Sequence, residues 1–172
     1  GITYVEIAAG RFHTVARCSD GLVVAWGSNA FGQCSVPALP PGLAYIQVAA
    51  GMNHSAALSS DGSVVAWGSN NWGQLDVPAP NTGFVAVAAG DQFDIGLKAN
   101  GSVVIWGRYE QSTVPLPNAG FEEVTANSGF AYGLRSQVTF KEHLVSTSAN
   151  FSTGVVAADV DGDGDTDAVT AE

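Results

Sequence analysis

The chain is poor in basic residues and in long apolar runs, and each shortage excludes a class of protein. Only six Lys and Arg stand against 16 Asp and Glu, which gives a formal net charge of −10 at pH 7. Binding to a nucleic-acid backbone needs clustered Lys and Arg, so we expect no nucleic-acid partner. No apolar stretch approaches the length of a membrane-spanning helix, and we expect no membrane insertion.

Cysteine is also scarce, with Cys18 and Cys34 as the two examples. They are predicted to lie at opposite ends of one strand, about 13 Å apart at ~3.3 Å per residue. A disulfide needs Cα atoms within about 7 Å, so we predict two free thiols. The sequence starts at Gly1 without a signal peptide, and we interpret it as a piece of a longer protein.

A repeated segment is what the chain has in abundance. An apolar stretch ending in Ala-Ala-Gly leads to Gly10, Gly51 and Gly90, and a less regular fourth copy leads to Gly129. The steps between these glycines are 41, 39 and 39 residues. Such a period is typical of stacked supersecondary units, so the search for function moves from single residues to a repeated surface.

Each repeat has the pattern of a β-meander. In the first copy we predict strands over 4–9, 13–18 and 22–26, with a two-residue hairpin at Asp20-Gly21 and a short outer strand over 33–36. Three or four short strands every 40 residues or so predict an all-β fold of propeller blades. About three and a half blades are present, which predicts an incomplete ring, and the Trp that ends each third strand is predicted to pack between blades.

The combined motif Val-Ala-Ala-Gly…His…Asp-Gly-x-Val-Val-Ala-Trp-Gly-x-Asn…Gly-Gln…Val-Pro resembles the regulator of chromosome condensation repeat. It is similar to the compact bacterial form found in the seven-bladed β-lactamase inhibitory protein. The resemblance implies a propeller region over residues 1–136 that acts by binding other proteins. Its predicted repeats span 4–44, 45–84, 85–122 and, in part, 123–136.

The repeat pattern ends after residue 136, and residues 137–172 resemble the start of an FG-GAP/VCBS repeat. Aspartates occupy alternate positions between two short apolar runs: Asp159, Asp161, Asp163, Asp165 and Asp167. So many carboxylates repel one another unless a cation neutralises them, and oxygen ligands at this spacing with Gly164 at the sixth position are typical of calcium. Thr170 stands where an EF-hand needs Glu, so we predict a Ca²⁺ loop in a hairpin between strands.

Two histidines invite a catalytic interpretation, but the repeats argue against it. His13 and His54 follow equivalent glycines by three residues, and by the same count Phe93 and Tyr132 stand in the third and fourth copies. A position that accepts His, Phe and Tyr favours a flat ring that packs. Neither a nucleophile elbow nor zinc-ligand spacing nor a triad order is present in the sequence, and we predict that the chain is not an enzyme.

The positions that differ between copies are the candidates for binding. They follow each repeated glycine or each Trp-Gly, and several are aromatic residues in turns, as at many binding hot spots. The predicted partner-binding residues are Arg11, Phe12, Phe31, Met52, Asn53, Trp72, Asp91, Gln92, Tyr109 and Phe130.

The sequence therefore predicts a non-catalytic protein-interaction scaffold with a calcium loop, from a secreted or surface-exposed bacterial repeat protein. One alternative is a protein inhibitor of a hydrolase such as a β-lactamase. Another is a non-catalytic part of a larger extracellular enzyme. The open blade edges also predict that the isolated piece self-associates.

Overall fold

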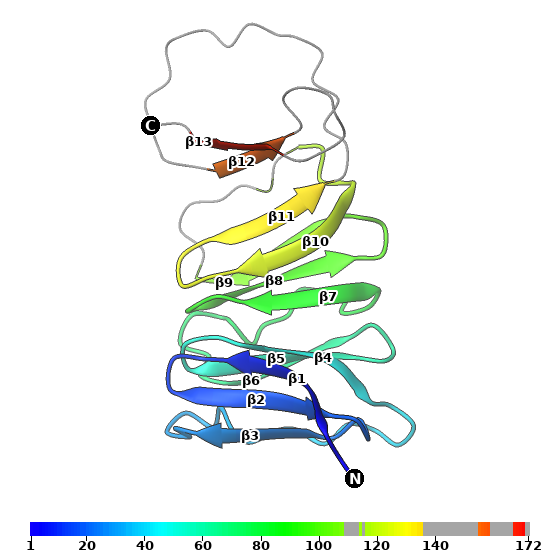
Figure 1. The fold of residues 1–172 in the computed structure, drawn as a ribbon, viewed down its shortest axis with the longest axis vertical. Helices are drawn as coiled ribbons and strands as arrows, with labels where there is room; N and C mark the ends of the chain where they lie inside the picture. Colours follow the sequence, from blue (N-terminus) through cyan, green and yellow to red (C-terminus); the bar gives the residue numbers. More distant parts are fainter. Residues whose placement is uncertain (109–113, 115, 136–154, 159–166, 171–172) are drawn as a thin grey trace, which may run out of the picture.

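The computed structural model describes residues 1–108, 114, 116–135, 155–158 and 167–170 (Figure 1). Every regular element in this part of the chain is a β-strand, which confirms the all-β fold class. The strands are β1 (Tyr4–Ala9), β2 (His13–Cys18), β3 (Val23–Gly27), β4 (Tyr45–Ala50), β5 (His54–Ser59), β6 (Val64–Gly68), β7 (Phe84–Ala89), β8 (Phe93–Lys98), β9 (Val103–Gly107), β10 (Phe121–Ala126), β11 (Ala131–Arg135), β12 (Val155–Ala158) and β13 (Asp167–Thr170).

Each of the first three repeats forms one antiparallel sheet of three strands, in the orders β1-β2-β3, β4-β5-β6 and β7-β8-β9. The described part of the fourth repeat forms the two-stranded sheet β10-β11. The predicted strands over 4–9 and 13–18 are confirmed, and the third strand runs one residue later than predicted, over Val23–Gly27. These sheets have the form of successive propeller blades.

The predicted outer strand over 33–36 is wrong. That segment forms turns instead, because its backbone groups are satisfied locally. The amide of Cys34 donates to Asn29 Oδ1 at 2.8 Å, and the amide of Val36 donates to the carbonyl oxygen of Cys34 at 3.1 Å. Asn70 repeats the arrangement by accepting from the amide of Leu75 at 2.9 Å. The Asn after each Trp-Gly-Ser therefore holds a compact loop, and the blades have three strands.

The blades stack face to face, and the core lies between them (Figure 1). The first strand of one blade packs across the first two strands of the blade before it: β4 on β1 and β2, β7 on β4 and β5, and β10 on β7 and β8. One buried cluster, for example, joins Val15 of the first blade to Tyr45, Val48 and Trp67 of the second. A single three-stranded sheet cannot bury both of its faces, so this stacking supplies the core.

The fourth repeat has a different register from the one the sequence predicted. In the first three blades the turn after the first strand is closed by a hydrogen bond from the amide of the repeated glycine to a carbonyl oxygen three residues later. Gly90, for example, donates to Phe93 at 2.8 Å. In the fourth blade the same bond runs from Asn127 to Phe130 at 2.9 Å. Asn127 and Phe130, and not Gly129 and Tyr132, are therefore the equivalents of Gly90 and Phe93.

The C-terminal strands β12 and β13 pair antiparallel, with Val155 opposite Thr170 and Ala158 opposite Asp167. This pairing confirms the predicted strand–loop–strand arrangement. The loop that joins them lies outside the described residues. Cys18 and Cys34 are both free thiols, as predicted.

Candidate recognition face

The Trp that ends each third strand forms a socket for a loop of the preceding blade. Trp67 Nε1 donates to the carbonyl oxygen of Gln33 at 2.9 Å, and Trp106 Nε1 donates to that of Gln74 at 3.0 Å. Both Trp side chains are 5% exposed. Trp26, the equivalent residue of the first blade, is 46% exposed. The prediction that these Trp residues pack between blades is confirmed for the two that have a described preceding blade.

The ring residues His13, His54 and Phe93 are buried against the repeated glycines. A Cβ at Gly51 would overlap both the His54 ring and the carbonyl oxygen of Gly90. Glycine is needed here because of this close approach and not because of a left-handed backbone. The expectation that the ring position serves packing is confirmed for these three residues.

The two histidines also make polar contacts across the blade interfaces, which the sequence analysis missed. His13 Nε2 lies 2.9 Å from Ser55 Oγ, and Ser55 Oγ donates to the carbonyl oxygen of Gln33 at 2.9 Å. Because the Ser55 hydroxyl proton is engaged there, His13 Nε2 carries the proton and donates. Burial, followed by the charge of the neighbouring His54, lowers the pKa of His13.

The next interface holds a buried histidine–carboxylate pair. His54 Nε2 lies 3.0 Å from Asp94 Oδ1, and both side chains are fully buried. Burial raises the pKa of Asp94, against the opposing effect of His54. In the third blade the ring residue is Phe93, and the position equivalent to Ser55 and Asp94 is Ala131, as the strand registers show. The two polar rings thus contact polar partners, and where the ring residue is apolar the equivalent position of the next blade is apolar too.

The turns that follow the repeated glycines all lie at one end of the blades. The β1–β2 and β10–β11 turns lie on the left in Figure 1. Backbone hydrogen bonds join the turns of successive blades, from the amide of Arg11 to Gly51 at 3.3 Å and from the amide of Asp91 to Ser128 at 3.3 Å. The loops after β3 and β6 start at the same end, since the amide of Ser28 donates to the carbonyl oxygen of Phe12 at 2.8 Å.

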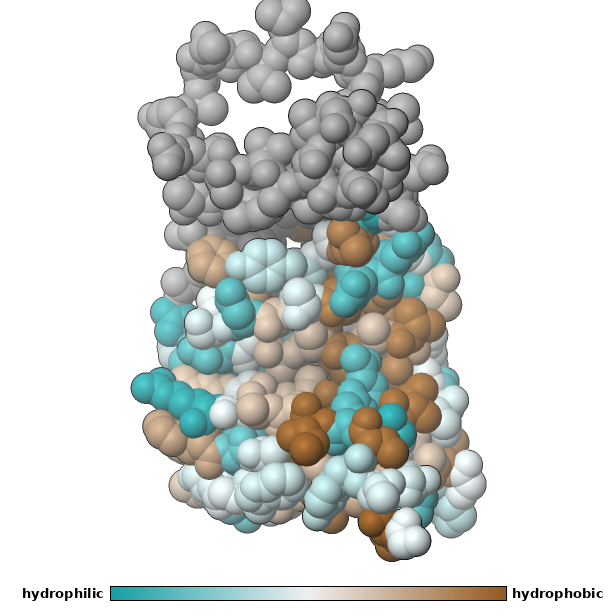
Figure 2. Space-filling model, in the orientation of Figure 1, coloured by the Kyte–Doolittle hydropathy of each residue, from teal (hydrophilic) through white to brown (hydrophobic). Residues whose placement is uncertain are grey.

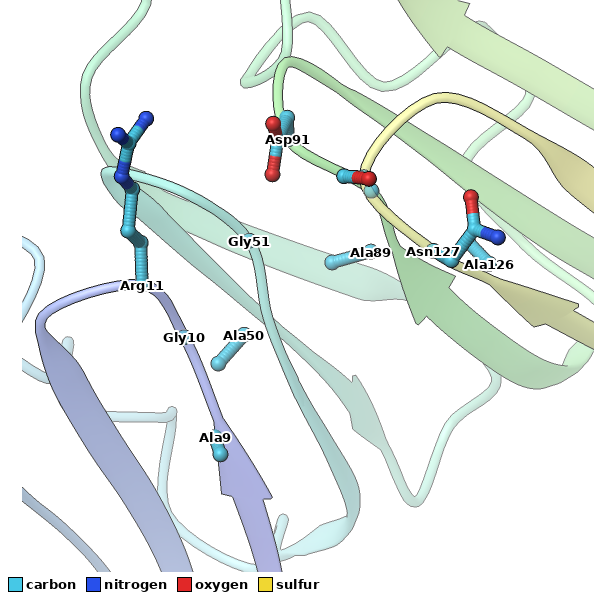
Figure 3. Close-up of a pocket in the computed structure, with 11 residues that line it drawn as sticks. Ala9, Gly10, Arg11, Ala50, Gly51, Ala89, Asp91, Ala126 and Asn127 are labelled. Atoms are coloured by element: carbon cyan, nitrogen blue, oxygen red, sulfur yellow. The ribbon is translucent and has the colours of Figure 1, made fainter.

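A pocket of about 520 Å³ opens between these turns. Its wall consists of the small residues that end β1, β4, β7 and β10, together with the glycines that follow three of them. Figure 3 shows Arg11, Asp91 and Asn127 around it, on the turns of the first, third and fourth blades, with Gly51 on the turn of the second blade between them. One cationic, one anionic and one amide side chain therefore stand at the mouth of an otherwise small-residue pocket.

Three predicted binding residues expose large aromatic rings at this end. Phe12 is 60% exposed, Phe31 is 49% and Trp72 is 48%. Phe31 and Trp72 occupy equivalent loop positions, because the amide of each donates to the side-chain oxygen of the Gln two residues later, at 2.9 and 2.8 Å. The buried glutamines thus fix the backbone of loops whose aromatic side chains reach solvent.

Two arginines accompany these rings. The Arg11 guanidinium lies 5.3 Å from the centroid of the Phe12 ring, and the Arg108 guanidinium lies 4.2 Å from that of Trp72. The second contact joins the end of β9 to the loop of the previous blade. Arg108 was not among the predicted binding residues, although its position directly after Trp-Gly was the signal that could have identified it.

Four of the remaining candidates are less exposed, and a fifth is exposed for another reason. The half-buried candidates each expose only part of the side chain; they are Met52, Asn53, Asp91 and Gln92. Phe130 is 54% exposed, but it occupies the ring position that is buried in the first three blades. The exposure of Phe130 therefore reflects a blade face on which, among the described residues, no further blade packs.

Tyr109 and the aspartates at 159, 161, 163 and 165 lie outside the described residues, and of Asp167 only the strand is described. Within the described ranges, no three His, Cys, Asp or Glu side chains gather closely enough to hold a metal ion. The same ranges contain no helix that could span a membrane.

Stacked three-stranded sheets with a loop end rich in aromatic residues define a protein built from β-propeller blades. Residues 4–33 and 45–74 match the regulator of chromosome condensation (RCC1) repeat. The two matched stretches coincide with the first two sheets, and the third and fourth sheets continue the same stack.

Solved structures support the same fold. The CRINKLY WD40 ectodomain of the receptor kinase ACR4 from Arabidopsis thaliana is 28% identical, with a TM-score of 0.61 over 74% of this chain and 45% of that one. Prp20p from Saccharomyces cerevisiae is 23% identical, with a TM-score of 0.64 over 78% of this chain and 44% of that one. At this identity the likeness to Prp20p shows the fold alone.

A curated relative matches a shorter stretch. The X-linked retinitis pigmentosa GTPase regulator homolog of Caenorhabditis elegans is 50% identical over 36 residues, which is 21% of this chain and 3% of that protein. The chain therefore spans a small part of this relative and less than half of the two solved structures.

Proposed function

We propose that the loop end of the blades is a protein-recognition face and that the chain is a non-catalytic interaction scaffold. The observation that carries the proposal is the gathering of Phe12, Phe31 and Trp72, each about half exposed or more, at the one end where the repeats differ. Exposed aromatic and Arg side chains on rigid loops are typical of binding hot spots. RCC1-type propellers generally serve as interaction scaffolds, and some promote nucleotide exchange.

Related proteins support binding as the general role. The yeast relative Prp20p has been described with binding properties toward Gsp1p and histones, and its structure has been solved with Kap60 bound. For this chain we propose a protein partner as well, and the surface chemistry alone does not name it.

The test is a comparison of capture by three forms of the chain. The recognition-face variant is Phe12→Ser/Phe31→Ser/Trp72→Ser, and the matched control is Leu22→Ser/Leu116→Ser, which removes exposed apolar side chains away from the recognition face. A true partner binds the wild type and the control with a defined stoichiometry. Its affinity for the recognition-face variant is roughly 100-fold weaker or worse. Equal binding to all three forms, measured by calorimetry, would contradict the proposal.

The inhibitor role remains a narrower form of the same proposal. It rests on the resemblance to the compact repeats of the β-lactamase inhibitory protein. A panel of purified β-lactamases tests it directly: sub-micromolar binding that the recognition-face variant loses would establish an inhibitor, and no binding by any of them would leave the general scaffold.

We also propose a calcium-binding loop between β12 and β13 and an extracellular or cell-surface location. The support is the alternate spacing of five aspartates from Asp159 to Asp167 and the antiparallel pairing of the flanking strands. Extracellular calcium modules bind with dissociation constants of about 10⁻⁴–10⁻³ M. Calcium at that concentration should protect the C-terminal region from proteolysis, and Asp161→Asn/Asp163→Asn should abolish the protection.

A further inference from the structure

Two turns at the loop end carry opposite charges on the wall of the pocket that lies between the blades. The Arg11 guanidinium donates to Met52 Sδ at 3.7 Å and lies 5.3 Å from the centroid of the Phe12 ring. Within the described part of the chain, neither Arg11 nor Asp91 takes part in an ion pair. Both charges are therefore available to a ligand.

The two charges flank one gap. The amide of Arg11 donates to the carbonyl oxygen of Gly51 at 3.3 Å, and the amide of Met52 donates to that of Asp91 at 3.2 Å. Turns bonded in this way lie about one strand spacing apart, so the backbones of Arg11 and Asp91 lie roughly 10 Å from each other. Figure 3 shows the two charged side chains on opposite sides of the turn that carries Gly51. A small molecule fits between them.

The rest of the pocket wall adds no further charge and little hydrogen-bonding capacity. The amides of the three repeated glycines already close their own turns. The side-chain oxygen of Asn127 already accepts from the amides of Gly129 and Phe130. In Figure 2 the most hydrophobic side chains of the face in view lie away from the left edge, where the turns lie. Recognition in this pocket therefore depends on Arg11 and Asp91.

One positive and one negative wall select a ligand that carries both charges. A simple anion is attracted by Arg11 but repelled by the Asp91 carboxylate, and a simple cation meets the reverse. A molecule with a carboxylate at one end and an ammonium group at the other pairs with both, through charge-assisted hydrogen bonds. The pocket volume of about 520 Å³ lies in the range of small-molecule sites.

We propose that this pocket binds a small zwitterion, an amino acid or a dipeptide. The ligand carboxylate pairs with the Arg11 guanidinium, and the ligand ammonium group pairs with the Asp91 carboxylate. The small residues of the pocket floor leave room for the atoms that join the two charges. The site adds a small-molecule ligand to the loop end and does not rest on recognition of a protein, because Phe31 and Trp72 do not line the pocket.

The test is an NMR titration of the full chain with glycine and with glycylglycine, followed at the amide signals of Gly51 and Gly90. Glycinamide lacks the carboxylate, and N-acetylglycine lacks the ammonium group. We expect each analogue to bind at least about tenfold more weakly than the tighter zwitterion, the loss of one charge-assisted hydrogen bond. The tighter zwitterion shows whether the site takes an amino acid or a dipeptide. If neither zwitterion shifts these signals, or if an analogue binds as tightly, the proposal is overturned.

Variants of the full chain assign the two charges. Arg11→Gln and Asp91→Asn should each weaken binding at least about tenfold. The exchange Arg11→Asp/Asp91→Arg should restore it, because both charges are present in reverse order. Two controls should leave the affinity unchanged: Arg17→Gln, which removes a cation outside the pocket, and Phe31→Ser/Trp72→Ser, which separates this site from protein recognition. Unchanged binding in the single pocket variants, no recovery in the exchange, or a loss in either control would overturn the assignment.

Discussion

The first and second blades share the Tyr and the Val-Val-Ala-Trp-Gly strand of the repeat, yet the equivalent Tyr and Trp side chains differ in burial. Trp26 and Trp67 both end a third strand and both stand beside a Tyr ring, but the first is 46% exposed and the second is 5% exposed. The difference lies in the neighbour and not in the blade. The stability of a stacked repeat resides largely in its interfaces, so equal motifs should contribute unequal free energies.

The largest effect should come from truncating the covered Trp. Trp67→Ala removes a buried ring and the hydrogen bond to Gln33, and we expect it to lower the free energy of unfolding by about 3–5 kcal/mol. Trp26→Ala should cost about 1 kcal/mol, because much of that ring is already in water. Urea denaturation of both variants gives the comparison. Equal losses would contradict the assignment of Trp67 as an interface anchor.

The next effect concerns the repeated glycines. Gly51→Ala forces a Cβ into the His54 ring and a backbone oxygen, and overpacking of this kind costs roughly 1–3 kcal/mol or more. Gly129→Ala is the matched control, because a Cβ there meets no atom within 4 Å. We expect its unfolding free energy to stay within about 0.5 kcal/mol of the wild type. A large loss at Gly129 would restore the register that the sequence predicted for the fourth repeat.

A smaller effect should follow from exchanging one polar interface for the apolar one. Asp94→Ala alone leaves His54 Nε2 buried without its partner and should cost about 1–3 kcal/mol. The double variant His54→Phe/Asp94→Ala reproduces the Phe93–Ala131 combination, and we expect it to regain part of this loss. Thermal unfolding of the single and double variants measures the coupling. A purely additive result would show that the two positions do not act as a pair.

The smallest effect is a dependence of stability on pH. The pKa of His13 is lowered in the folded state, so below its ordinary value of 6.5 the unfolded chain binds a proton that the folded chain does not. Stability should therefore fall as the pH drops below 6.5. The raised pKa of Asp94 acts in the opposite direction, because its stabilising effect is lost as the pH rises through the folded-state value.

The variant His13→Phe separates these two contributions. Without the histidine, the loss of stability between pH 6.5 and lower values should be smaller than in the wild type, while the contribution of Asp94 is retained. Melting temperatures over this range provide the measurement. An unchanged acid dependence in His13→Phe would mean that the proton uptake occurs elsewhere.

The strands and the stacking could be predicted from the sequence because the same short-range signals recur in each copy. Asp20-Gly21 and Asp61-Gly62 mark the hairpins, and a Trp-Gly ends each third strand. The fourth register could not be predicted in this way, because Asn127 replaces the repeated glycine while an unrelated Gly129 lies two residues later. Backbone bonding, which the sequence does not display, decides between the two.

The polar interface pairs were missed for a different reason. Each pair joins one position of a repeat to the next position of the following repeat, so the partners lie 42 residues apart for His13 and Ser55 and 40 residues apart for His54 and Asp94. The signal was present: Ser55, Asp94 and Ala131 vary in step with the ring residues of the preceding blades. The aromatic residues of the recognition face were predicted correctly as exposed loop residues, since turns leave large side chains outside the core.

Hydrogen exchange of the four indole N–H groups in the unmodified chain tests the central claim most directly, namely that the fixed Trp residues are interface anchors and that Trp72 belongs to the exposed recognition face. The structure predicts two slow indoles, Trp67 and Trp106, and two fast ones, Trp26 and Trp72. Four equally fast indoles would show that the blades do not stack as described. A slow Trp72 would show that its loop is covered and would remove the recognition face from the account.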